Sequence, residues 1–345
     1  MNGRTRNFEE RKAPNWVKLA YSWLVGMTGA LERFLCHRTR RVHLNTGFQE
    51  TIMAHSHILL GAGDIPAQPS IRRIGFADLK EALAEGFDDF KAMPTHAMFL
   101  CAIYPIIGLV LARLAFGYSI LPLLYPLASG FVLVGPLAAL GLYELSRRRE
   151  AGLPGAATHA FDVVRSSSIG AIVALGMLLL LIVGVWLAVA NAIYVADFGY
   201  APPASFASFA HEVLTTPAGW NLIVVGNGVG FCFAVIVLTI SVVSFPLLLD
   251  RDVGAAVALL TSIRAVAKNP LTMATWGLIV AALLALGSLP FFLGLTVVLP
   301  VLGHATWHLY RKVVEPDTSP RPRLRDDPPR HSAVDFPANL FPWIR

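Results

Sequence analysis

One uninterrupted apolar stretch, residues 169–195, constrains the fold of this chain more than any other feature. It has no charged residue in twenty-seven positions, and its central window, 172–191, holds twelve Leu, Ile or Val residues. At roughly −0.3 to −0.6 kcal/mol each on a membrane-insertion scale, these residues favour the bilayer by about 4–7 kcal/mol. At about 1.5 Å of rise per residue, a helix of this length also crosses a hydrocarbon core of about 30 Å. The stretch therefore predicts a transmembrane helix.

Composition extends this prediction to the whole chain. Of its 345 residues, 55% are hydrophobic and only 14% are charged, whereas a soluble domain has about 25% charged residues. The formal net charge of +6 could suggest a nucleic-acid partner, but the basic residues gather in segments that flank the apolar stretches, as the positive-inside rule requires. We expect an all-α polytopic membrane protein that binds no nucleic acid.

Six transmembrane helices are predicted, at 97–116, 121–143, 169–195, 220–249, 271–289 and 291–310. The connections at 117–120 and around Pro290 are so short that the spans on either side must form helical hairpins, which predicts three hairpins. Twenty-seven of the 28 Lys and Arg residues lie on one side of the predicted topology and none lies in the opposite loops. Both termini are therefore expected in the cytoplasm.

The predicted membrane domain, 71–312, is flanked by two different extensions. Residues 1–70 contain an amphipathic segment at 16–35, which favours a helix lying on the membrane surface; a seventh span is the alternative. Met53 also stands where an alternative start codon could lie, so the sequence leaves open whether residues 1–52 are translated. Residues 313–345 are rich in proline and arginine and poor in apolar residues, which predicts a disordered cytoplasmic tail.

Short amphipathic helices are predicted before the hairpins. The clearest covers 74–93, with Phe87 among its apolar residues and Asp89 among its polar ones, and it is expected to pack on the protein's own helices or on a partner. Three times the chain repeats such a helix, a break, two spans and a proline near the exit of the second span. The exit prolines are Pro136, Pro246 and Pro300. This predicts an internal repeat, with hairpins around an axis along the membrane normal and a cytoplasmic collar of amphipathic helices.

Five sequence blocks resemble a bacterial integral-membrane family catalogued as domain-of-unknown-function 2189. They are FDDF at 87–90, GPLAALGLYE at 135–144, SRRRE at 146–150, SFPLLLD at 244–250 and GHATWHLYR at 303–311. The resemblance covers about residues 72–312. It implies a multi-pass protein of the bacterial inner membrane, and it brings no reaction, no cofactor and no site residues.

Four histidines form the candidate metal site. His304 and His308 stand at i and i+4 on one helix face, as two metal or haem ligands would, and the topology puts His96 and His159 at the same depth. Ordinary interfacial histidines are the alternative, since no carboxylate completes a metal motif such as H-E-x-x-H. The interfacial reading is preferred, and no cofactor is expected.

Two polar residues fall inside predicted spans. Arg113 is the one charge within a span, and either it reaches the outer interface or it forms an anion site there. Asn227 lies between Gly226 and Gly230, which form a small-xxx-small face for close helix packing. A hydrogen bond across that face is the preferred role for Asn227, and a substrate site is the alternative.

No nucleophile with its base and no paired carboxylates can be recognised, so no enzymatic activity is expected. The first hypothesis is a non-catalytic scaffold or accessory factor of a membrane protein complex, embedded in the lipid bilayer. The sequence leaves open whether the protein forms a homo-oligomer. The second is a small transporter or channel along the repeat axis, and the third is a metal- or haem-binding protein near the respiratory chain.

Overall fold

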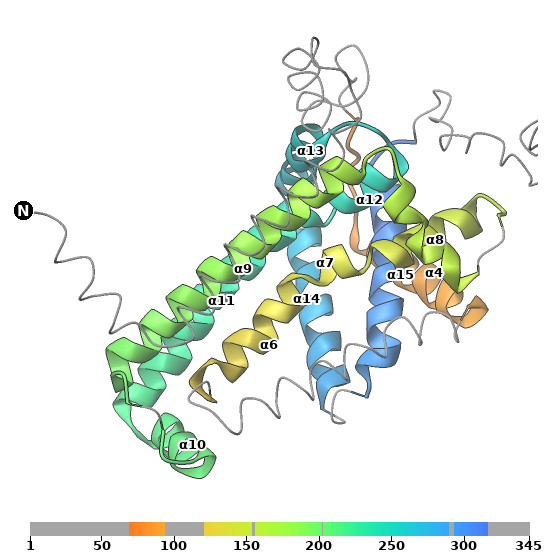
Figure 1. The fold of residues 1–345 in the computed structure, drawn as a ribbon. Coiled ribbons are helices and arrows are strands. Elements are labelled where there is room, and N and C mark those ends of the chain that lie inside the picture. Colours follow the sequence, from red (N-terminus) through yellow and green to blue (C-terminus); the bar gives the residue numbers. More distant parts are fainter. Residues whose placement is uncertain (1–68, 94–120, 154–155, 202, 290–292, 317–345) are drawn as a thin grey trace, which may run out of the picture. The chain divides into compact units, whose positions relative to one another are not determined.

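The computed structural model describes residues 69–93, 121–153, 156–201, 203–289 and 293–316, all within one compact unit, Ser56–Arg345 (Figure 1). Each element in these ranges is a helix, apart from an isolated antiparallel bridge between Ile71 and Val314. The predicted all-α fold is confirmed for them. The predicted extension 1–70, except its last two residues, the first span 97–116 and nearly all of the tail 313–345 lie outside the described residues.

The chain builds its described helices in the following order. They are α4 (Phe76–Ala92), the 3₁₀ helix η1 (Leu121–Leu123), α6 (Leu124–Leu133), α7 (Gly135–Ala138), α8 (Leu140–Glu150), the 3₁₀ helix η2 (Ala157–Arg165), α9 (Ile169–Phe198), α10 (Phe206–Thr215), α11 (Pro217–Ser241), α12 (Ser244–Asp250), α13 (Ala255–Lys268), α14 (Pro270–Ser288) and α15 (Leu295–Val313).

Three described helices are long and apolar enough to cross a membrane: α9, α11 continued by α12, and α14. They match the spans predicted at 169–195, 220–249 and 271–289. Their outward faces carry large apolar side chains, such as Val224, Phe231 and Leu278, each about two-thirds exposed. Water would disfavour such surfaces, whereas lipid tails would cover them. The protein is therefore an integral membrane protein with several apolar helices.

Two other predicted spans take a different form. The stretch predicted at 121–143 is divided among η1, α6, α7 and the start of α8, because Pro136 near the start of α7 lacks an N–H for the preceding turn. At ten residues, α6 is only about 15 Å long. Where 291–310 was predicted, α15 covers Leu295–Val313, and its C-terminal half is mostly buried in protein.

The junction between α11 and α12 shows how a side chain breaks a helix. In a regular helix, the Val243 N–H would donate to the Thr239 carbonyl. Here the Ser262 hydroxyl of α13 stands between them, accepting from the Val243 N–H at 3.2 Å and donating to the Thr239 oxygen at 2.8 Å. Pro246 adds a second missing donor. The helix consequently bends, and α12 enters the interior.

The core of the described fold lies where α8, α12 and α15 meet. Each contributes a fully buried leucine: Leu145, Leu248 and Leu309. Each also has one further helix packed against it: η2 packs on α8, α13 on α12 and α4 on α15. The three central helices are those of the predicted exit prolines: α8 begins shortly after Pro136, α12 contains Pro246 and α15 contains Pro300.

Small residues permit the close approach of these helix pairs. A Cβ added to Gly86 of α4 would lie 2.5 Å from the backbone nitrogen of Ala305 in α15. A Cβ on Gly141 of α8 would lie 3.1 Å from the Ala160 side chain of η2. In the third pair, the Ser244 hydroxyl of α12 donates to the Ala258 carbonyl of α13 at 3.1 Å.

A short strap joins the two ends of the described membrane domain. The Arg72 N–H donates to the Val313 carbonyl at 2.7 Å, beside the bridge between Ile71 and Val314. On the other side of the strap, the Asn269 side chain accepts from the Ile74 N–H at 2.9 Å and donates to the Arg72 carbonyl at 3.1 Å. The strap therefore links the end of α15 to the start of α14.

The buried face of α4 differs in part from the face that its apolar residues predict. Phe87 is nearly half exposed, whereas Asp89, expected on the polar face, is only 3% exposed. Leu79, another apolar residue of the helix, is buried as expected, together with Ala82 and Gly86. The close contact of Gly86 with α15 decides this rotation, because a large side chain cannot fit there.

Substituting Gly86 by alanine tests this contact. The added methyl group would overlap the α15 backbone, and we expect a loss of about 1–3 kcal/mol of stability, as for overpacked cores. Gly226→Ala is the matched control, because a Cβ there meets nothing within 4 Å. Thermal unfolding in detergent should show a lower midpoint for Gly86→Ala alone. Equal midpoints for both variants would contradict the close packing of α4.

Candidate functional site

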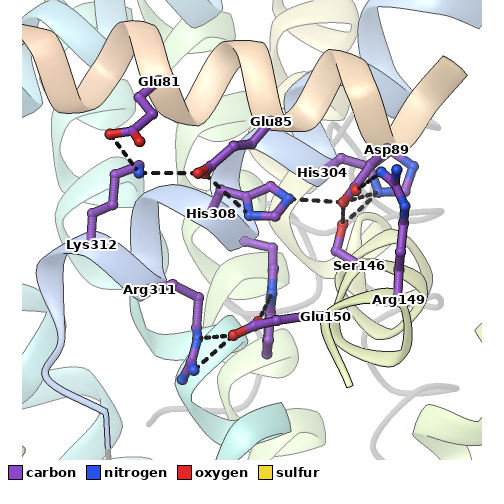
Figure 2. A network of polar contacts seen from close by, with 11 residues as sticks. Glu81, Glu85, Asp89, Ser146, Arg149, Glu150, His304, His308, Arg311 and Lys312 are labelled. Atoms are coloured by element: carbon purple, nitrogen blue, oxygen red, sulfur yellow. Dashed lines mark hydrogen bonds and ion pairs between the residues drawn. The ribbon is translucent and has the colours of Figure 1, made fainter. Parts of the chain in front are cut away.

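The polar side chains of the core converge on the buried carboxylate of Asp89, on the inner face of α4 (Figure 2). Its Oδ2 accepts a hydrogen bond from the Ser146 hydroxyl at 2.5 Å and pairs with His308 Nε2 at 2.9 Å. Its Oδ1 is paired with the Arg149 guanidinium. One carboxylate thus joins α4 to α8 and to α15.

His304 extends this cluster into the interior, where its side chain is fully buried. Its Nδ1 lies 2.7 Å from the Ser146 oxygen and 3.9 Å from Asp89 Oδ2. The Ser146 hydroxyl has one hydrogen, which it donates to Asp89, so its oxygen accepts from His304. This assigns the hydrogen of a neutral His304 ring to Nδ1.

A second group of charges runs along the same side of α4 (Figure 2). Glu85 lies 3.4 Å from His308 Nδ1 and 3.3 Å from the Lys312 ammonium, and Glu81 lies 2.9 Å from the same ammonium. These carboxylates face His308 and Lys312 of α15. The acidic helix α4 is therefore neutralised by the basic end of α15.

The third group connects α8, α12 and the end of α15. Glu150 accepts hydrogen bonds from Trp307 Nε1 at 3.0 Å and Arg311 Nε at 2.9 Å. Asp250, at the end of α12, accepts from the Tyr310 hydroxyl at 2.8 Å and lies 3.4 Å from Arg311. Arg311 thus binds both carboxylates and holds the three exit segments together.

A fourth group holds η2 on α8. Arg147 donates two hydrogen bonds of 2.8 Å to the buried Glu144, one turn before it. Arg148 lies 3.7 Å from the same carboxylate and 3.1 Å from Asp162 of η2. The hydrogen bonds to Glu144, helped by its charge, raise the pKa of Arg147 above its ordinary value.

The electrostatics of the cluster keep Asp89 ionised. Burial disfavours its charged form, but the hydrogen bonds from His308 and Ser146 outweigh this effect, so the pKa of Asp89 is lowered from its ordinary value. A buried carboxylate with these partners accepts hydrogen bonds at neutral pH rather than transferring a proton. Its chemistry suits fixing helices in place.

The structure brings two of the four candidate metal ligands together. His304 and His308 both face Asp89, whereas His159, on η2, accepts a hydrogen bond from the Ala156 N–H at 3.0 Å. His96 lies outside the described residues. Among the residues described, no group of three His, Cys, Asp or Glu side chains has an arrangement that could hold a metal ion. The metal site stays a prediction.

Of the polar and small residues predicted to lie inside spans, the structure describes Asn227, Gly226 and Gly230. Asn227 accepts a hydrogen bond from the Tyr125 hydroxyl at 2.7 Å and donates to the Ile223 carbonyl, so it links α11 to α6. A Cβ on Gly230 would lie 3.1 Å from the Trp186 ring, whereas one on Gly226 would meet nothing within 4 Å. Arg113 lies outside the described residues.

A cavity of about 310 Å³ lies beside the Asn227 pair, among α6, α9, α10 and α11. Its lining is largely apolar and aromatic, with Trp186, Tyr194 and Phe209 among the larger side chains. The indole N–H of Trp186 does not face a free space, since it donates to the Pro126 carbonyl at 3.1 Å. Such a lining suits apolar groups better than ions.

Residues 123–250 match the family model DUF2189, described as a predicted integral membrane protein. The resemblance drawn from the sequence blocks is thereby confirmed for this segment, and its extension to 72–122 and 251–312 stays a prediction. A comparison with curated proteins and one with solved structures each found no match.

The DUF2189 segment contains only part of the polar cluster. Ser146, Arg149, Glu150 and Asp250 lie within it, whereas Asp89 and the residues of α15 lie outside. The partners of Asp89 were not predicted. A signal was present, however: Asp89 stands three residues after Gly86 and seven after Ala82, on one helical stripe of small residues. A carboxylate on such a stripe requires a buried partner.

The substitution Asp89→Asn tests the cluster. It preserves the shape of the side chain but removes the charge that faces Arg149 and His308. Because the Arg149 side chain is 42% exposed, the expected loss is that of charge-assisted hydrogen bonds at one buried group, about 1.5–3 kcal/mol. Asp88→Asn is the matched control, because the Asp88 side chain is 61% exposed and pairs only with exposed Lys91, so its loss should cost less than about 1 kcal/mol.

The measurement is thermal or denaturant unfolding of both variants in the same detergent. Because the pKa of Asp89 is lowered in the folded protein, its stabilisation is present above its unfolded pKa of about 4 and is lost as the pH falls through the folded value. The gap between wild type and Asp89→Asn should therefore narrow in acid. A variant as stable as Asp88→Asn at neutral pH would refute the role of Asp89.

Proposed function

We propose that this protein is a non-catalytic scaffold or assembly factor of a membrane protein complex. The observation that carries the proposal is the outward face of α4, which is held rigidly by Asp89, Glu85 and Glu81 on its other side. A helix fixed in this way costs little entropy when a partner binds to it.

The outward face of α4 has the features of a helix-docking surface. Small residues, Ala77 and Ala84, form an exposed track along it. The exposed charged side chains beside this track are those of Lys80, Asp88 and Lys91. Phe87 is 46% exposed, with the Lys91 ammonium 4.9 Å from its ring centre. A partner helix could approach the alanines closely and bury the phenylalanine, while its own charges meet those on either side.

The buried polar groups support a structural rather than a catalytic role. Asp89, Glu144 and Asp250 are each engaged by hydrogen bonds or ion pairs that link helices. A general base or nucleophile needs access to a substrate, whereas these groups are buried against neighbouring protein.

We place the chain in the bacterial inner membrane with six spans in three hairpins and both termini in the cytoplasm. The asymmetry of Lys and Arg supports this orientation. The recurring pairs α4 with α15, η2 with α8 and α13 with α12 support an internal repeat with a cytoplasmic collar. In each pair, a helix that precedes a hairpin packs on a segment that leaves one.

Cysteine labelling in intact cells tests this topology. In a background without native cysteines, Tyr200→Cys, in the exposed link between α9 and α10, should react with a membrane-impermeant maleimide. Asp88→Cys, on the exposed face of α4, should react only after the inner membrane is opened. The reverse pattern would show that the topology is inverted. Equal labelling of both positions would show that they do not lie on opposite sides of the membrane, which contradicts the proposed topology.

The docking surface is tested with Ala84→Arg, which places a long cation on the small-residue track. Ala207→Arg is the matched control, since Ala207 is also exposed on a helix but lies on the opposite side of the predicted membrane. Native mass spectrometry of protein extracted from its own membrane should find a co-purifying subunit with wild type and with the control. Ala84→Arg should reduce that subunit at least tenfold, which corresponds to about 1.4 kcal/mol.

Two results would contradict the scaffold hypothesis. One is a bare protomer or homo-oligomer in every sample, and the other is a subunit that Ala84→Arg leaves in place. A protomer that carries a small molecule or lipid would favour the second hypothesis, a transporter or channel. The cavity beside Asn227 supports that alternative for an apolar solute, because its lining offers few polar groups.

The third hypothesis, a metal- or haem-binding protein, rests on His304 and His308. It requires a bound metal or haem, in about one-to-one stoichiometry by the coordination rules for such sites, that is lost in His304→Ala. The same mass measurement would detect it.

A further inference from the structure

We propose that the outer face of η2 is an interfacial anchor that inserts into the cytoplasmic leaflet and binds anionic phospholipid headgroups. This face consists of Thr158, Phe161 and Val164, with Arg165 on the adjacent side of the helix. It is separate from the outward face of α4. The proposal does not depend on the scaffold hypothesis, but its choice of the cytoplasmic leaflet rests on the topology proposed above.

The periodicity of η2 gives this helix two apolar sides. In a 3₁₀ helix, residues three apart lie directly above one another. Ala160 and Val163 are therefore on one side, where they are 5% and 7% exposed against the protein. Phe161 and Val164 are on another, where they are 65% and 68% exposed. Packing on α8 accounts for the first pair only.

The position of η2 along the chain brings the exposed pair to the membrane surface. Only three residues separate Arg165 from the first residue of α9. At thirty residues, α9 is about 45 Å long, which is close to the 40–45 Å thickness of a bilayer with its headgroups. Both ends of α9 therefore lie near headgroup level, and so does η2. At this level an exposed phenylalanine and valine meet the boundary between headgroups and acyl chains.

The exposed charge of η2 favours anionic lipid over neutral lipid. The Arg165 side chain is 70% exposed, and its closest recorded carboxylate, that of Asp162, is 3.9 Å away. The neighbouring arginines of α8 are already paired, Arg147 and Arg148 with Glu144 and Arg149 with Asp89, so Arg165 is the cation of η2 that faces outward. An exposed cation beside inserted apolar groups is the arrangement that binds anionic leaflets. The exposed face of α4 carries mixed charges, Lys80, Asp88 and Lys91, so a lipid surface fits η2 better than it fits α4.

The arrangement recurs on α13, which directly precedes α14. Leu260 and Ile263 are exposed on one side of α13, while Ala258 and Ala265 are fully buried on the other. Lys268 follows near the start of α14. A second collar helix before a span thus also presents apolar side chains outward.

Site-directed spin labelling in nanodiscs tests the anchor. Single cysteines replace Phe161 or Val164 in the full-length protein without native cysteines, in discs of phosphatidylcholine with phosphatidylglycerol. Collision rates of the label with oxygen, which concentrates in lipid, and with a water-soluble nickel chelate give its depth. Leu278→Cys, on the lipid-facing side of α14, and Asp88→Cys, on the exposed face of α4, are the deep and the aqueous controls.

We expect labels at 161 and 164 to favour oxygen over the chelate, at a depth between the two controls. A label as accessible to the chelate as that at 88 would overturn the proposal. Exclusion of both reagents would also overturn it, because protein rather than lipid would then cover the face. Two independent positions keep the test valid if one variant fails to fold.

The preference for anionic lipid has its own measurement. Without phosphatidylglycerol the label at 161 should become shallower, and Arg165→Gln should abolish this difference between the two kinds of disc. If the depth is the same in both discs for the native arginine, Arg165 does not bind a headgroup.

Discussion

The buried carboxylate of Asp89 is the interaction on which the described structure most depends. It is the point where α4, α8 and α15 are joined, through Arg149 and Ser146 on one side and His308 on the other. A charge this far from water is stable only when its hydrogen-bonding positions are filled. The helices must therefore keep their relative positions, and the outward face of α4 is presented rigidly.

The bilayer imposes the complementary constraint. Backbone groups inside a membrane must be satisfied within the protein, so a helix may break only where another side chain replaces its hydrogen bonds. Ser262 does this at the junction of α11 and α12. The break directs α12 into the core, where Asp250 meets Tyr310 and Arg311. The apolar spans and the polar core are linked by such junctions.

The all-α class and the three apolar spans were predictable, because hydrophobic length acts locally. The family resemblance was also visible in short blocks. The buried side of α4 was predicted only in part: Leu79 is buried as its apolar face predicted, whereas Phe87 is nearly half exposed. The contact of Gly86 with Ala305 decides this rotation. The partners of Asp89 were missed because they lie 57 to 219 residues away along the chain.

The sequence by itself determined that this chain enters a membrane as helices, because transfer free energy depends on the composition of each segment. Only the tertiary structure decided which polar residues became buried partners, and which apolar residues of η2 and α4 remained at the surface. Those outcomes depend on the meeting of three segments that are distant in sequence. Close packing of small residues and pairing of buried charges stabilise that arrangement. Both interactions join residues of different segments, so they cannot be predicted from one segment alone.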